Sequence, residues 1–140
     1  MVPEPGNKQF KNSKMIELKG FNEVAKQIHQ ANADKGFYEI VPEIGTSLML
    51  VVSELAEALE AHRKNIKPDC SRYFKKDMIE GKDFEHTFML HIKDSFNDEI
   101  ADTMIRLFDL SGHLGIDLEF HIEQKLKYNS LRPYKHGKDY

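Results

Sequence analysis

The chain has 140 residues, a formal net charge of −3 at pH 7 and one cysteine, Cys70. This length suits one domain, and a lone cysteine excludes an internal disulfide framework. The slightly acidic balance gives no overall attraction for nucleic acid, and no apolar run approaches the roughly 18 residues that a membrane span needs. We therefore expect neither nucleic acid nor a membrane as partner. The N-terminus lacks the apolar stretch of a secretory signal, so a cytoplasmic location is expected.

The first helix is predicted to follow a loose leader. Residues 1–18 hold prolines, a glycine and scattered lysines, and they are expected to be flexible, ahead of a single domain over 19–140. From Gly20 a helical period begins, and Gly36 is its expected end. The apolar residues at i, i+3, i+4 and i+7 that define this period are Phe21, Val24, Ala25 and Ile28.

A second helix is predicted from near Pro42, which suits a first turn, to about Arg63. Its apolar stripe consists of Ile44, Leu48, Val51, Val52, Leu55 and Leu59. An extended polar connector follows over about 64–95. Because it contains Pro68 and Gly81, we expect mainly loop there, with one short helix.

The helical period returns at Phe84 and lasts to Gly112. The residues that carry it are Phe88, Ile92, Phe96, Ile100, Met104 and Leu107. This pattern predicts one long helix, or two helices with a break near 93–95. Gly112 and then Gly115 are expected to end it.

A last helix is predicted after Asp117, a favourable N-cap residue, and before Pro133, which cannot continue a helix. Its stripe is narrow and consists of Leu118, Ile122 and Leu126. No segment shows strand alternation. The predicted fold class is therefore all-α, an antiparallel bundle of about four helices.

Two pairs of acids stand out on the second and third predicted helices. Glu54 and Glu57 are three residues apart, so they project from one side of a helix about 60° apart. This helix is apolar around most of its circumference, and a carboxylate buried there is costly unless it is paired or bound to metal. Glu99 and Asp102 repeat the spacing. If the two helices pack antiparallel, four carboxylates converge and demand a cation.

The oxygen ligands of such a site favour Mg²⁺, with Mn²⁺ as the alternative, over zinc. The histidines form neither H-x-x-x-H nor E-x-x-H with these acids, which argues against zinc hydrolases and di-iron bundles. An ordinary explanation remains open for the second pair. Arg106 follows Asp102 by four residues, so a salt-bridged helix face would also account for these acids.

A basic stripe lies on the last predicted helix. Lys125, Asn129 and Arg132 are spaced four and three apart. They are either a solvated helix end whose cations suit the helix dipole, or a substrate-binding clamp that holds the oxygens of a polyphosphate.

Three segments of the sequence carry a resemblance to a known family. SELAEALEAHR, DEIADTMIRLFDLSGHLGID and KLKYNSLRP resemble the MazG-like nucleotide pyrophosphohydrolases of the all-alpha NTP pyrophosphatase superfamily, with its E-x-x-E…E-x-x-D signature. The resemblance covers about residues 20–138. The chain departs from the family pattern in one respect, because the 41 residues between Glu57 and Glu99 form a longer gap than usual.

The resemblance implies Mg²⁺-dependent hydrolysis of a nucleoside triphosphate to the monophosphate and pyrophosphate, in nucleotide pool control. It implies a homodimer or homotetramer with active sites near subunit interfaces. The implied metal ligands are Glu54, Glu57, Glu99 and Asp102. The implied phosphate contacts are Lys125 and Asn129, and Arg132 is expected to join them.

In the mechanism expected from these residues, a water activated by the metal attacks the α-phosphorus. One of the four acids would act as general base, and the sequence leaves its identity open. Two alternatives remain at this point: a nucleotide-binding or regulatory helical module without turnover, and a structural bundle whose acids are salt-bridged.

Overall fold

The computed structural model describes residues 20–75 and 82–133, and over these residues it contains six helices and no strand. The predicted leader 1–18, Gly81 and the basic tail after Pro133 lie outside the described residues. The helices are α1 (Phe21–Asp34), α2 (Ile44–Arg63), α3 (Cys70–Lys75), α4 (Lys82–His91), α5 (Phe96–Leu114) and α6 (Leu118–Ser130). The all-helical prediction is confirmed.

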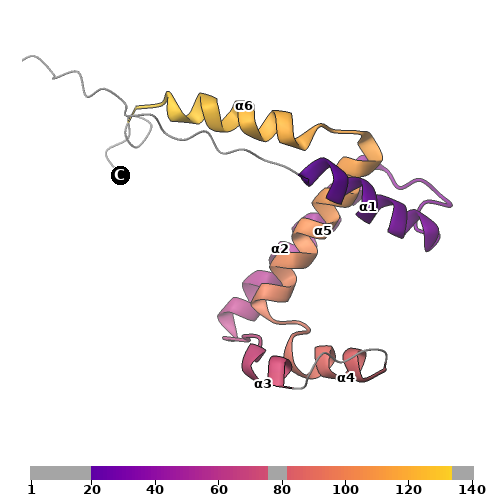
Figure 1. Ribbon diagram of the computed structural model, residues 1–140, viewed down its shortest axis with the longest axis vertical. Coiled ribbons are helices and arrows are strands. Elements are labelled where there is room, and N and C mark those ends of the chain that lie inside the picture. The colour runs from indigo at the N-terminus through magenta and orange to yellow at the C-terminus, as the bar shows by residue number, and fades with distance from the viewer. Residues whose placement is uncertain (1–19, 76–81, 134–140) are drawn as a thin grey trace, which may run out of the picture.

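Helix α5 is the centre of the structure, because both α1 and α2 pack along it (Figure 1). Helices α2 and α5 run antiparallel: Glu54 meets Arg106, whereas His62, further along α2, lies beside Phe96 at the start of α5. Small residues line the packed side of α2. Ala58 and Ala61 are buried there, which brings the two helices close together.

The contact between α1 and α5 depends on Gly112. An added Cβ at this position would lie 2.3 Å from the carbonyl oxygen of Ala25 and 2.8 Å from Cβ of His29. The expectation that Gly112 ends the helix is wrong, because α5 continues to Leu114 and Gly115 takes the left-handed C-cap conformation. Gly112 instead removes a side chain where two helices touch.

Helix α6 projects from the junction of α1 and α5 and does not fold back along α5 (Figure 1). Asp117 caps it as predicted, since its carboxylate accepts a hydrogen bond from the Phe120 N–H at 3.0 Å. Asn22 of α1 secures the junction by donating to Asp117 at 2.8 Å and bonding to the backbone of Glu119. A bundle of four helices is therefore not confirmed: within the described residues, α1, α2 and α5 pack together and α6 stands apart.

The connector contains two helices in its described part, α3 and α4, which pack on each other at the opposite end of α5 (Figure 1). Of the two alternatives expected after Phe84, two helices with a break near 93–95 is the one observed, since α4 ends at His91 and α5 begins at Phe96. Ser95 is the N-cap of α5, and its buried hydroxyl accepts from the Asp98 N–H. None of the six helices is both long enough and apolar enough to cross a bilayer.

Large apolar side chains remain exposed along both central helices. On α2 they form a row at helical spacing, each about half exposed: Leu48, Val52, Leu55 and Leu59. On α5 a second row consists of Ile100, Met104 and Leu107. Single exposed apolar residues are ordinary, but rows of this length typically mark a surface that another element covers.

Candidate metal centre and the adjoining pocket

Three of the four predicted metal ligands come together between α2 and α5. Carboxylate oxygens of Glu54, Glu99 and Asp102 all lie within 4.8 Å of one another. Glu54 and Glu99 are on the faces where the two helices pack, and they are only 7% and 4% exposed. Asp102 lies at the open edge of the group. The antiparallel packing expected from the sequence is what brings Glu54 to the second acid pair.

The Glu99 carboxylate has an unsatisfied atom. Its Oε2 is buried and has no hydrogen-bond partner in the described part of the chain. A buried polar atom without a partner is uncommon and costs stability. Burial raises the pKa of Glu99, and the negative charges of Glu57, Glu54, Asp102 and Asp98 raise it further. The group thus favours either a proton or a cation at this point.

Glu57, the fourth predicted ligand, is exposed and does not share the 4.8 Å cluster. It is nevertheless the strongest like-charge neighbour of Glu99, whose pKa it raises. Glu57 therefore borders the site, close enough for its charge to affect the pKa of Glu99. Its role as a direct ligand stays a prediction.

Asp98 is a member of the acidic group that the E-x-x-D pattern does not include. It raises the pKa of Asp102, second only to desolvation in that effect, while Arg106 lowers it. Oxygens of Asp94, Asp98 and Glu99 form a second group within 4.8 Å. One Asp98 oxygen is already engaged, because it accepts a hydrogen bond from the Asp94 N–H at 3.0 Å. The D-E doublet in the sequence was the available signal.

Arg106 pairs across the helix interface. Its Nε donates to Oε1 of Glu54 at 2.5 Å. The spacing along the helix suggested Asp102 as its partner, whereas the closest ion pair that Arg106 makes in the described residues joins α5 to α2. A purely intrahelical salt-bridged face therefore does not account for the acids.

A pocket of about 390 Å³ opens directly beside the acids. Glu54, Asp102 and Arg106 form one side of it, and Phe37 and Tyr38, from the connection between α1 and α2, form another. The volume falls within the range of about 300–1,000 Å³ typical of small-molecule sites. It thus combines an acidic end, one cation and an aromatic wall.

Asp109 holds the far wall of this pocket in place. Its Oδ1 accepts from the Tyr38 hydroxyl at 2.9 Å and lies 3.1 Å from Nδ1 of His29, and its Oδ2 accepts from the Asn32 amide at 2.8 Å. Desolvation and the Asp109 carboxylate raise the pKa of Tyr38 to about 12, so the hydroxyl remains a donor. Asp109 was not among the residues expected from the sequence, although an acid between Phe108 and Leu110 is typical of a buried carboxylate with hydrogen-bond partners.

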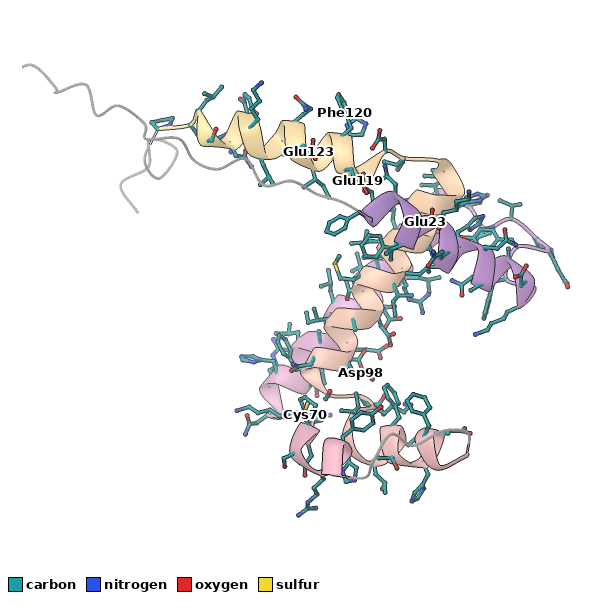
Figure 2. All side chains as sticks on the ribbon, in the orientation of Figure 1. Glu23, Cys70, Asp98, Glu119, Phe120 and Glu123 are labelled. Atoms are coloured by element: carbon teal, nitrogen blue, oxygen red, sulfur yellow. The ribbon has the colours of Figure 1, made fainter. Side chains whose placement is uncertain are left out.

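The structure does not bring the basic stripe to the acids within one chain. Asp98 marks the acidic end of α5, whereas Glu123, on the same helix as Lys125, lies beyond the other end (Figure 2). Lys125 and Arg132 each lie over the ring of Tyr128, at 5.3 and 5.2 Å from its centroid. Oδ1 of Asn129 is buried without a partner among the residues described. The phosphate clamp stays a prediction.

Comparison of the chain with family models, with curated proteins and with solved structures finds no match. The geometry of the acids and the pocket therefore carries the functional argument.

Proposed function

We propose that this chain is a Mg²⁺-dependent nucleoside triphosphate pyrophosphohydrolase, which forms the monophosphate and pyrophosphate and serves nucleotide pool control. The observation that carries the proposal is the buried, unpartnered Oε2 of Glu99 among converging carboxylates, next to a pocket of ligand size. An acidic cluster alone is common on protein surfaces. A buried carboxylate oxygen without a partner inside such a cluster supports a cation site, because a bound cation would satisfy it.

The donor set fits a hard divalent ion. Glu54, Glu99 and Asp102 offer only carboxylate oxygens, which suit Mg²⁺ or Mn²⁺ better than zinc. Glu57 borders this group, since its charge raises the pKa of both Glu99 and Asp102, and we propose that it joins the site once an ion is bound. Such an ion supplies charge that neutralises phosphate oxygens and a water of lowered pKa.

The pocket suits the rest of a nucleotide. We place the nucleoside against Phe37 and Tyr38, since aromatic rings stack on bases, with the phosphates toward the acids. In the reaction, the oxygen of a water bonds to the α-phosphorus while the bond to the bridging oxygen breaks, and pyrophosphate leaves. An acid of the group that is free to accept the proton of that water acts as general base.

We further propose a homodimer or a homotetramer. The exposed apolar rows of α2 and α5 and the projecting α6 (Figure 1) both suit a second copy. That copy would cover the apolar rows and extend its own Lys125, Asn129 and Arg132 toward the triphosphate. In a two-fold symmetric dimer, each copy would contribute its basic residues to the site of the other copy.

The test is release of pyrophosphate from a panel of ribo- and deoxynucleoside triphosphates, with Mg²⁺ and with chelator. Glu99→Gln should abolish release. Glu60→Gln is the matched control on α2, because Glu60 is exposed and pairs with Lys64 at 2.9 Å. Release of single phosphate would overturn attack at the α-phosphorus, and binding without release would support a module without turnover.

A further inference from the structure

The ion pair between Arg106 and Glu54 engages a carboxylate that the proposed metal ion would also need. Glu54 is the α2 member of the 4.8 Å cluster, and one of its two oxygens already accepts from Arg106 Nε. Without metal, the guanidinium is thus the cation that offsets part of the clustered negative charge. A divalent ion bound by the same carboxylates would lie next to this guanidinium and repel it.

The Arg106 side chain has room to adopt another conformation. Its side chain is 41% exposed, and it lines the pocket beside the acids. Within residues 20–75 and 82–133, Arg106 makes one side-chain hydrogen bond, and its partner is Glu54. Rotation about its side-chain bonds therefore exchanges one partner for the open pocket, and guanidinium groups bind phosphate oxygens in forked geometry.

We propose that Arg106 is a cation displaced by metal: it neutralises Glu54 while the site is empty, and it turns into the pocket to bind a phosphate oxygen of the nucleotide once a divalent ion is held. This inference rests on the proposed function, and it adds an order to that function. Metal binding comes first and creates the anion-binding group, so nucleotide binds tightly only to the loaded protein.

A purely structural salt bridge makes the opposite prediction. If Arg106 only holds α5 against α2, its removal loosens the helix interface and weakens the metal site. If Arg106 competes with the ion, its removal tightens metal binding, because a competitor and a repelling charge both disappear. The sign of the change in metal affinity therefore separates the two roles without any measurement of activity.

The experiment is calorimetric titration of the full chain with Mn²⁺ and with Mg²⁺. Wild type is compared with Arg106→Gln and with the control Arg72→Gln, whose side chain is 74% exposed on α3. We expect Arg106→Gln to bind metal about tenfold more tightly, which is about 1.4 kcal/mol, and Arg72→Gln to match wild type. Arg106→Lys keeps the positive charge, so its metal affinity should stay near that of wild type. A change seen in Arg106→Gln and not in Arg106→Lys is then due to the lost charge.

A second titration uses α,β-methylene analogues of the four deoxynucleoside triphosphates at saturating Mg²⁺. Arg106→Gln should bind the analogue that wild type prefers about tenfold more weakly, the scale of one lost charged hydrogen bond. Metal affinity that is unchanged or weaker in Arg106→Gln overturns the displacement, and unchanged analogue affinity overturns the phosphate contact; either result leaves the proposed function standing. Absence of metal binding to wild type would overturn both the inference and the proposed function.

Discussion

The carbonyl oxygen of Ala25 lies only 2.3 Å from the position that a Cβ on Gly112 would occupy. Gly112→Ala should therefore push α1 away from α5 and lower the free energy of unfolding by about 1–3 kcal/mol, the scale of overpacking. Denaturant unfolding measures this change. Gly45→Ala is the matched control, because no atom of the described residues lies within 4 Å of an added Cβ in this helical position. A control as unstable as the Gly112 variant would contradict the proposed contact.

Stability should depend on pH through the acidic cluster. The folded-state pKa values of Glu99 and Asp102 are raised, chiefly by burial, so above the unfolded pKa of about 4 the folded chain holds more protons than the unfolded chain. Through these two groups, the metal-free protein should lose stability as pH rises from the unfolded pKa values through the folded ones. Thermal melts in chelator across this range should show that loss, and Mg²⁺ should diminish it. The contribution of these two acids is isolated by comparison with the double variant Glu99→Gln/Asp102→Asn. A contribution of the opposite sign would argue against repulsion at the site.

Removing the charge of Glu99 should stabilise the metal-free protein and reduce the stabilisation that Mg²⁺ provides. An amide in Glu99→Gln can donate to the Glu54 or Asp102 carboxylate where two acids now repel, so the metal-free variant should be more stable than wild type by on the order of 1 kcal/mol. Wild type should gain stability from Mg²⁺ by mass action, and the variant should gain less. Calorimetric melts in chelator and in Mg²⁺ measure both effects.

Glu57→Gln should produce the same pattern more weakly, since its side chain is exposed at the border of the cluster. A destabilised Glu99→Gln whose melt is unchanged by Mg²⁺ would instead indicate a structural acid.

The basic stripe should affect substrate and not metal. Lys125→Ala and Arg132→Ala should weaken nucleotide affinity or turnover while metal binding stays near wild type, because Lys125 lies on α6 and Arg132 lies just after its C-cap Leu131, away from the acids. Lys127→Ala on the same helix is the control. Steady-state kinetics paired with metal titration distinguish the outcomes. Wild-type kinetics in both variants would contradict the phosphate clamp and would indicate that these residues form a solvated helix end.

The chain should associate. Leu55 is 48% exposed in the apolar row of α2, so Leu55→Asp should shift the mass measured by light scattering toward that of one chain. Ile40→Asp, at a residue that is 88% exposed in the α1–α2 connection, should leave the mass unchanged. A wild-type mass of one chain across micromolar concentrations would contradict association.

Periodicity alone located the central helices well. The predicted span from near Pro42 to Arg63 corresponds to α2, which begins at Ile44 and ends at Arg63, because a continuous apolar stripe and a following polar stretch define both ends. A short polar run marked where a break could fall before Ser95, but the pattern alone also allowed one long helix. The convergence of Glu54 with Glu99 and Asp102 followed once antiparallel packing was assumed.

Features that depend on tertiary contact were not readable in this way. Gly112 as a helix terminator and Gly112 as a point of close approach look identical in one sequence, and only the position of Ala25 decides between them. Arg106 had a satisfactory partner four residues away, yet the packing of α2 offered Glu54. The direction of α6 is set by the hydrogen bonds between Asn22 and the α6 N-terminus, which local propensity does not encode.

The Asp109 network divides the pocket into parts of unequal rigidity. Between α1 and α2, the described backbone hydrogen bonds of 35–43 are local, and Tyr38 supplies the hydrogen bond that reaches α5. Phe37, beside it, is 65% exposed. Segments with few buried contacts open at low free energy, while the packed pair α2 and α5 opens only with the core. The aromatic wall is therefore expected to open more readily than the packed pair α2 and α5, which holds the carboxylate cluster.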